Sequence, residues 1–136
     1  MWNPFRRRSP RPEFEVGQEW HYHTRPVEPE STLVIGRIES GANGNTVHIS
    51  VRGLRIANPN AEGGIAETIA HLALAEESLS RSVTDLSGRG IPDEQFEGGY
   101  AEWLEGTGGE GAFSITVAEA VETVEAVLGG VLGRAT

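Results

Sequence analysis

The segment ESGANGNTVHISV, residues 39–51, constrains the fold more than any other part of the chain. Asn43-Gly44 lies between two runs of β-forming residues, and this pair is preferred in two-residue type I′ hairpins because both positions need a positive φ. The pair therefore predicts a hairpin in which Ile38 faces Ile49. This register places apolar residues opposite each other on one face, as cross-strand pairing favours.

A second hairpin is predicted before the first, because the Pro-containing turn 26–29 ends a strand. Pairing across this turn places Trp20 opposite Gly36 and Tyr22 opposite Val34. A Trp side chain over a strand glycine fills the gap that the missing side chain leaves. The predicted core face then consists of Trp20, Tyr22, Val34, Ile38, Val47, Ile49 and Val51.

The next part of the chain allows two interpretations. The apolar phase shifts after Gly53, which predicts a bulge there, and the Pro, Asn and Gly content of 58–64 predicts a loop. Residues 65–87 fit one long helix, except that Glu76 interrupts its apolar stripe. A strand near 68–74 followed by a helix at 76–87 is the alternative that we favour.

The C-terminal half predicts two further helices. Apolar spacing indicates one helix at 93–105 and a short strand at 111–117. Thr116 and Glu119 then form a capping box that opens a last helix, which Gly129 ends. The predicted class is α+β: an antiparallel β-meander of three N-terminal strands plus one or two later strands, with two to three helices packed on one face.

The length of 136 residues is typical of one domain. We predict a single α+β domain over 13–129, a disordered Arg/Pro-rich tail at 1–12 and a frayed tail at 130–136. The sequence has no cysteine, which excludes disulfides and thiolate chemistry. The basic start lacks the apolar stretch of an export signal, and no apolar run is long enough to span a membrane, so we expect a cytoplasmic protein.

The net charge of −9 is unevenly distributed. Residues 1–60 carry eight Arg and six Glu, whereas 61–136 carry three Arg and fourteen acidic residues. Phosphate affinity depends on clustered positive charge, so specific nucleic-acid binding is not expected of this acidic protein. The use of Arg without any Lys, beside abundant Ala, Gly and Glu, suggests a bacterial source.

His21 and His23 share one strand face, and a His-x-His pair binds a metal when a third ligand converges on it. Glu19 is the nearest candidate for that ligand. The predicted register places the two histidines beside aliphatic residues, and it places His48 on the same face roughly 16 Å from His21, at ~3.3 Å per residue and ~4.8 Å per strand. Ordinary hydrogen-bonded histidines are therefore favoured over a metal site.

Other motifs carry little functional weight. GTGGEG at 106–111 matches a phosphate-binding letter pattern, but a helix precedes it and a strand follows, the reverse of what that site needs. The P-x-x-P at 26–29 is typical of a rigid loop. The acidic pairs lie on polar helix faces, and no nucleophile elbow, P-loop or metal-protease motif occurs. We therefore predict no cofactor and no catalytic residue, and enzymatic activity stays an open alternative.

The outer face of the predicted sheet is the strongest candidate for function. It is rich in Arg and His on an otherwise acidic protein, and Arg beside exposed aliphatic groups is typical of interfaces. A solvated sheet face is the competing interpretation. The candidate binding surface consists of Arg25, Glu28, Arg37, His48 and Arg52.

GQEWHYHTRPVEPESTL, VHISVRGLRI and SLSRSVTDL together resemble a family of short uncharacterised bacterial proteins. That family shows a W-x-Y-x-T-R-P-x-E pattern and a later V-H-I-x-V-x-G-L, and the resemblance spans about residues 14–128. It implies a compact bacterial α+β domain and no assigned activity. The two histidines at 21 and 23 are not pattern positions, which weakens the metal hypothesis.

Two functions follow from these observations. The first is a non-catalytic binding or protein-interaction module that uses the Arg/His sheet face, with a protein partner or self-association as a homodimer, and with no nucleic acid or membrane as partner. The alternative is a small metal-dependent enzyme or metal-binding protein centred on His21, His23 and Glu19.

Overall fold

A computed structural model describes residues 12–129 of the chain. The tails predicted at 1–12 and 130–136 lie outside this range except for residue 12. The strands of the described part are β1 (Gln18–Tyr22), β2 (Thr32–Glu39), β3 (Thr46–Ala57), β4 (Ile65–Ala75) and β5 (Val83–Arg89). The helices are the 3₁₀ turn η1 (Glu62–Gly64), α2 (Glu76–Ser82), α3 (Phe96–Thr107) and α4 (Val117–Leu128).

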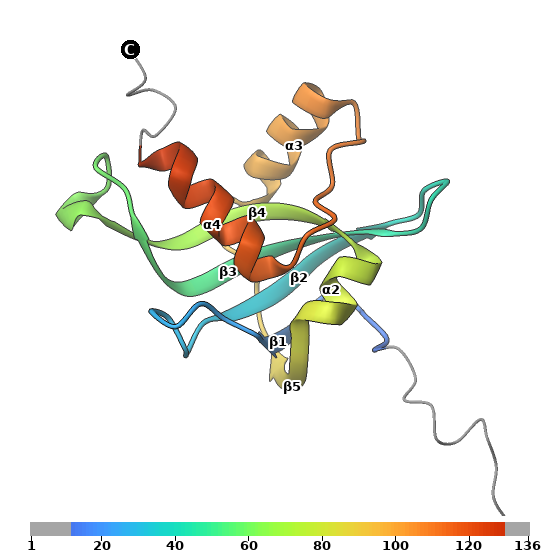
Figure 1. Cartoon of the computed structure of the whole chain (residues 1–136). Helices are drawn as coiled ribbons and strands as arrows, with labels where there is room; N and C mark the ends of the chain where they lie inside the picture. Colours follow the sequence, from blue (N-terminus) through green and yellow to red (C-terminus); the bar gives the residue numbers. More distant parts are fainter. Residues whose placement is uncertain (1–11, 130–136) are drawn as a thin grey trace, which may run out of the picture.

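The five strands form one antiparallel sheet in the order β4-β3-β2-β1-β5. Strands β1 to β4 are neighbours in chain order, and β5 returns to pair with β1 at the opposite edge (Figure 1). The α+β class and the antiparallel meander with later strands are thereby confirmed. The sheet has two edges, β4 and β5.

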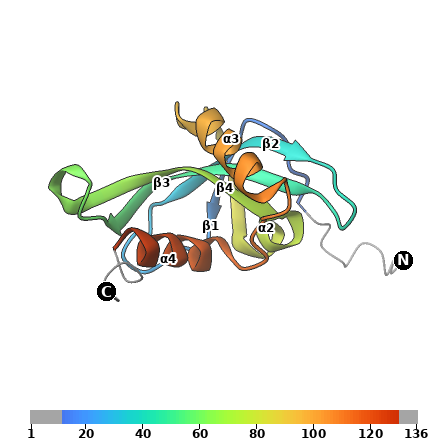
Figure 2. The same cartoon turned by 90° about the horizontal axis from the view of Figure 1, so that it is seen from above.

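The helices lie on both faces of the sheet, whereas the sequence predicts them on one. Helices α2 and α4 cover one face, and α3 lies on the other (Figures 1 and 2). The alternation along β3 shows why both faces need cover. Val47 and Ile49 belong to the main core, while His48 and Ser50 point the other way and are buried too.

The first predicted hairpin exists, but its turn and register differ from the prediction. The chain leaves β2 at Glu39 and enters β3 at Thr46, and the Gly44 amide donates to the Gly41 carbonyl across 3.2 Å within this longer loop. Ile49 therefore pairs with Ile35, not with Ile38. A bulge at the glycine between Ile35 and Arg37 shifts the remaining pairs.

The register between β1 and β2 also differs from the prediction. Trp20 pairs with Leu33 and Glu19 with Val34, so the predicted pairing of Trp20 with Gly36 is wrong. Leu33 therefore belongs to the main core, although it was expected on the outer face. A shift of an odd number of residues exchanges the two faces of a strand, which explains the error.

The interpretation of residues 65–87 as strand then helix is confirmed by β4 and α2. The helix ends at Ser82, however, and the residues predicted to continue it form β5. The predicted bulge near Gly53 is confirmed, because its φ is +74° and the β3–β4 register shifts between Arg52 and Ile56. A φ of this value is a left-handed backbone conformation, which glycine adopts without strain because it has no Cβ atom.

The two later helices are close to their predicted positions. Helix α3 covers 96–107 where 93–105 was predicted, and the capping box of Thr116 and Glu119 opens α4. The strand predicted at 111–117 is wrong. Only Phe113 pairs there, as an isolated parallel bridge to Leu74.

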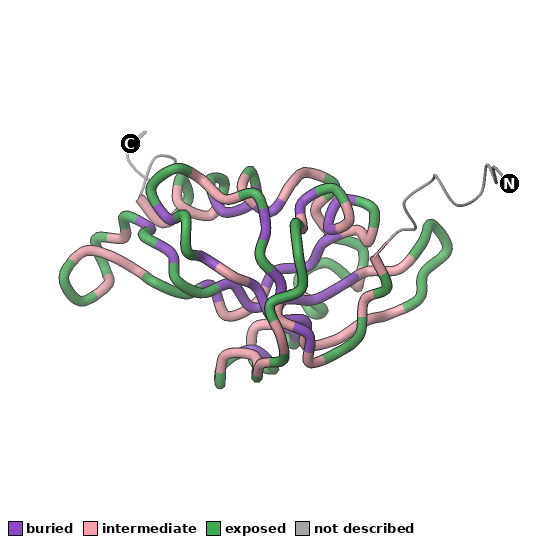
Figure 3. The backbone as a smooth tube through the Cα atoms, turned by 90° about the horizontal axis from the view of Figure 1, so that it is seen from below, coloured by how far each residue is buried: buried purple, intermediate pink, exposed green. Residues whose placement is uncertain are grey.

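The main core lies between the sheet and the α2–α4 layer. Buried residues gather at the centre of the molecule, and the hairpin tips are exposed (Figure 3). Its fully buried aliphatic side chains include Leu33, Ile35 and Ile49 from the strands and Val117 and Val121 from α4. This layer contains almost only apolar groups, whereas the layer under α3 does not.

Candidate functional site

The five residues of the predicted binding surface do not form one surface. Arg25 and Glu28 pair with each other in the loop between β1 and β2, and Arg25 also pairs with Glu125 of α4. His48 is buried beneath α3, and Arg37 lies over the ring of Tyr100 with its side chain 43% exposed. The Arg52 side chain is 44% exposed, and its guanidinium lies 3.4 Å from Glu19 at another part of the surface.

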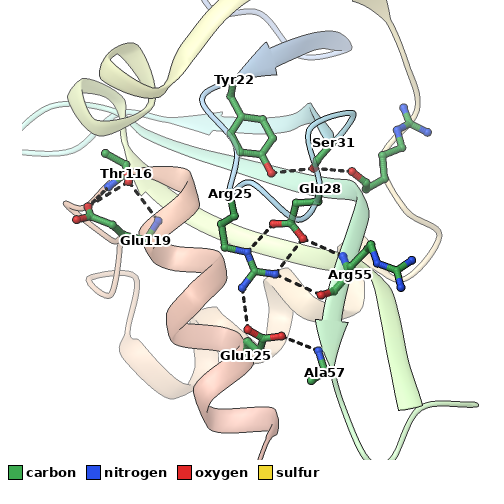
Figure 4. Close-up of polar contacts among 10 residues, drawn as sticks. Tyr22, Arg25, Glu28, Ser31, Arg55, Ala57, Thr116, Glu119 and Glu125 are labelled. Atoms are coloured by element: carbon green, nitrogen blue, oxygen red, sulfur yellow. Dashed lines mark hydrogen bonds and ion pairs between the residues drawn. The ribbon is translucent and has the colours of Figure 1, made fainter. Parts of the chain in front are cut away.

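Arg25 is the centre of a clamp that joins three segments (Figure 4). Its Nε donates to Oε2 of Glu28 across 2.7 Å, and its Nη1 donates to Oε1 of Glu125 across 2.8 Å. Glu28 Oε1 accepts the Arg55 amide, and Glu125 Oε2 accepts the Ala57 amide. The clamp therefore ties the β1–β2 loop to α4 and to the end of β3.

The charged groups of the clamp pair with one another. The Glu28 side chain is fully buried and the Arg25 side chain is 10% exposed. The hydrogen bonds to Glu28 raise the pKa of Arg25, and the Ala57 amide lowers the pKa of Glu125. Arg25 and Glu28 thus hold the fold together, and they offer little charge to a ligand.

The strongest polar cluster lies on the opposite face, beneath α3. His48 is fully buried, and its Nε2 lies 3.0 Å from Oε1 of Glu39. Its Nδ1 lies 2.8 Å from Nε2 of His71 on β4. Arg37 donates to Oε2 of Glu39, and the Tyr100 hydroxyl donates to the same oxygen. We call Arg37, Glu39, His48, His71 and Tyr100 the relay cluster.

The protons of the relay cluster can be assigned from its partners. The hydrogen bond from Tyr100 is the largest cause that lowers the pKa of Glu39 to about 2, so this carboxylate is ionised and accepts from His48. Burial lowers the pKa of His48 and lowers that of His71 to about 4, so both rings are neutral at pH 7. His48 Nδ1 is then a bare acceptor, and His71 Nε2 donates to it.

Aromatic side chains of α3 cover the cluster. Tyr100 and Trp103 lie edge-on to the His48 ring, with ring centroids 4.9 and 4.8 Å away. Phe96 fills the space above Gly36, where a Cβ atom would lie 2.4 Å from its ring. The glycine predicted to lie under Trp20 therefore lies under Phe96 instead.

A groove runs beside this cover, between α3 and the edge strand β4. Its walls are residues 69–71 of β4 and, from α3 and the turn before it, Glu94, Gln95, Gly98, Gly99, Glu102 and Trp103. It is an open groove of about 770 Å³. We call it the α3–β4 groove, after the two elements that supply most of its walls.

Two adjacent glycines of α3 face this groove with different surroundings. A Cβ atom on Gly99 would lie 2.8 Å from the Cβ of His71, so packing of α3 on β4 requires glycine there. A Cβ atom on Gly98 would meet nothing within 4 Å. Glycine inside a helix costs about 1 kcal/mol relative to Ala, so packing explains Gly99 but not Gly98.

The histidines of the predicted metal site lie apart from the clamp, the relay cluster and the α3–β4 groove. His21 and His23 are exposed at the β1 end of the sheet. Glu19 accepts a hydrogen bond from Thr32 and pairs with Arg52. Within residues 12–129, no three metal-binding side chains gather at one point.

Sequence reasoning identified Arg37 and His48 but missed their partners. Glu39 and His71 meet His48 through the pairing of β2 and β4 with β3, and Tyr100 reaches Glu39 because α3 folds over the second face. No local sequence pattern predicts these long-range contacts. One signal was present: a Gly-Gly pair inside a predicted helix has a cost, and it indicates a close approach or an open surface. Here it marks both.

No known protein family, curated protein or solved structure matches this chain. The resemblance to short bacterial proteins stays a prediction. Among the helices that the structure describes, none is long and apolar enough to cross a membrane.

Proposed function

We propose that this domain is a non-catalytic binding module whose binding site is the α3–β4 groove. The observation that carries the proposal is the pair of glycines: Gly98 keeps a helix wall open at an energetic cost that no contact within the fold explains. Residues that break a local rule without a packing reason are expected at functional sites.

The polar groups support binding over catalysis. A general acid or base must reach a substrate with a free proton-accepting or proton-donating atom, but both ring nitrogens of His48 are already hydrogen-bonded, one to Glu39 and the other to His71. Burial keeps His71 neutral with a pKa of about 4, a weak base at neutral pH. The relay cluster acts instead as a support that fixes α3 over β4.

The other sheet edge is a poorer candidate for binding. Strand β5 is exposed along most of its length, and Leu86 is 51% exposed. Two register shifts interrupt its pairing with β1, at the intervals Glu19/Trp20 and Trp20/Tyr22. The register between β3 and β4 also shifts twice, so bulges do not distinguish the two edges. What distinguishes β4 is α3, which supplies the second wall of the groove beside it.

A groove-filling substitution tests the proposal. Gly98→Trp places a large side chain in the groove, and Gly106→Trp on the same helix is the matched control, because its Cβ also meets nothing within 4 Å and it lies outside the groove walls. Full-length wild-type, Gly98→Trp and Gly106→Trp proteins are immobilised and exposed to a lysate of the source organism. Captured proteins are quantified by mass spectrometry and then retested as purified pairs.

At least one purified protein should bind the wild type and Gly106→Trp with equal affinity and bind Gly98→Trp at least tenfold more weakly. Circular dichroism melting curves show whether each variant is folded. Partners that bind folded Gly98→Trp as well as wild type would place the binding site elsewhere and refute the groove as the site.

A further inference from the structure

We infer that the occupant of the α3–β4 groove is an extended, positively charged segment of another protein. This inference rests on the proposed function and adds the chemistry of the partner. Three features carry it: an open strand edge on one wall of the groove, carboxylates on the other wall, and an extended residue of the chain itself that already pairs with the end of that edge.

The open edge is β4. It is the last strand of the sheet, and within the described residues only Phe113 pairs with its outer side. The Phe113 amide donates to the Ala73 carbonyl, and the Phe113 carbonyl accepts the Ala75 amide, each across 2.8 Å. The chain itself therefore already pairs an extended residue with the end of this edge. Residues 69–71, next along the strand, form the groove wall.

The bulge of β4 limits how such a segment binds. The β3–β4 register shifts between Ile49 and Val51, opposite residues 70–71. A long regular ladder is therefore opposed at this point. A segment in the groove would gain few backbone hydrogen bonds from β4, and its side chains would supply most of the specificity.

The charge of the other wall selects a cationic segment. Glu94 and Glu102 line the groove, and its walls contain no Lys or Arg. The imidazole of His71 adds no positive charge at neutral pH, because burial lowers its pKa to about 4. Opposite charges across an interface favour encounter and exclude partners of the wrong sign, so acidic segments and nucleic acids are disfavoured.

The position of the carboxylates sets the character of the ligand. Glu94 lies in the turn before α3 and Glu102 lies within the helix, so two separate acidic groups line this wall of the groove. In an extended chain, every second side chain points to the same face. The partner should therefore carry at least two Arg or Lys residues on one face.

Selection from a phage-displayed library of random 12-residue peptides tests the inference on the full-length protein. The library is selected on wild type and counter-selected on Gly98→Trp. Individual peptides are then synthesised with a fluorescent label, and their binding is measured by fluorescence anisotropy. The variants are Gly98→Trp, Gly106→Trp and the double variant Glu94→Gln/Glu102→Gln, which removes the charge and keeps the shape.

The expected peptides carry at least two basic residues on one face of an extended chain. They should lose at least tenfold in affinity on Gly98→Trp and on the double Gln variant, and they should bind Gly106→Trp like wild type. Their affinity should also fall as salt rises. Each variant is first shown to be folded by its melting curve.

Three results would overturn the inference. Peptides that are lost on Gly98→Trp but keep their affinity for the double Gln variant would leave the groove as a binding site and remove the cationic partner. If no enriched peptide depends on Gly98, both the groove as a binding site and the cationic partner would be refuted. A peptide of residues 1–11, which contains Arg6, Arg7, Arg8 and Arg11, is measured in parallel. If it binds as tightly as the best selected peptide, the occupant belongs to this chain and not to another protein.

Discussion

The two faces of the sheet are both buried, but by opposite chemistry. Facing α2 and α4, β3 presents Val47 and Ile49 to a layer of aliphatic side chains. Facing α3, the same strand presents His48 and Ser50 to hydrogen-bonding partners. One side is stabilised mainly by removing apolar surface from water, and the other also depends on hydrogen bonds among the polar groups that it buries.

The difference shows which face can be adapted to function. An aliphatic layer tolerates changes of shape if volume is kept, whereas a buried polar network depends on every partner. The polar face also leaves a groove with an open helix wall, which the aliphatic face does not need. The proposed binding groove thus lies on the opposite side of the sheet from the aliphatic layer, and the substitutions below test this contrast.

The largest effect is expected on the aliphatic face. Ile49→Ala should lower the free energy of unfolding by about 4 kcal/mol, because it removes buried methyl groups and leaves a cavity. Ser50→Ala on the next position should cost about 1–2 kcal/mol, since it leaves the Ala70 carbonyl and the Asp93 amide without this partner. Urea denaturation measures both. Equal losses would contradict the contrast between the faces.

The clamp beside the aliphatic face should give the next largest effect. Arg25→Ala leaves the carboxylate of Glu28 buried without its counter-charge and should cost about 3 kcal/mol. Arg52→Ala removes a half-exposed ion pair with Glu19 and should cost less than about 1 kcal/mol. The same denaturation curves compare them, and a loss at Arg52 as large as that at Arg25 would refute this account of the clamp.

A smaller effect of opposite signs is expected at the two glycines of α3. Gly99→Ala forces a methyl group against His71 and should destabilise the protein by about 1–3 kcal/mol. Gly98→Ala meets open space and should stabilise it by up to about 1 kcal/mol. Thermal melting is the measurement. A destabilised Gly98→Ala protein would show that Gly98 has a packing role and would weaken the proposed function.

The smallest effect on the free energy of unfolding is expected from a change of one pH unit. His71 has an ordinary pKa of 6.5 and a pKa of about 4 in the folded protein, so between these values the unfolded chain binds a proton that the folded protein does not. The free energy of unfolding should therefore fall as pH drops from 6.5 to 4, by at most about 1.4 kcal/mol per pH unit for one proton.

His71→Gln keeps a donor toward His48 and should flatten this pH dependence. His23→Gln is the matched control, because His23 is exposed and lies outside the relay cluster. Urea denaturation at pH 7, 6, 5 and 4 separates the two variants. A His71→Gln protein with the pH dependence of wild type would assign the proton uptake to another group.

Local signals in the sequence predicted local structure well. The capping box at Thr116, the bulge at Gly53 and the strand-to-helix change after Ala75 depend on residues close together in the chain, and all three occur. Strand β5 was missed because VTDLSGR at 83–89 follows a helix without a turn signal. The extended conformation of β5 is explained by its pairing with β1, which is distant in the sequence.

The register could not be predicted, because it depends on distant contacts. Leu33, Val34 and Ile35 are all apolar, so their pattern does not reveal which face each one occupies. The bulge at Gly36 accompanies the Phe96 side chain, sixty positions later in the chain. The same limit applies to the candidate site. His48 was expected on a solvated face and is buried beneath α3, whereas Arg37 from the same predicted face stays 43% exposed.

The clamp has a consequence for folding kinetics. It joins Arg25 to Glu125, one hundred positions away, so the long intervening loop must be organised before this contact forms. Contacts of this kind are expected after the transition state for folding, where they slow unfolding and leave the folding rate nearly unchanged. The carboxylate of Glu125 would then act as a latch that closes last and opens first.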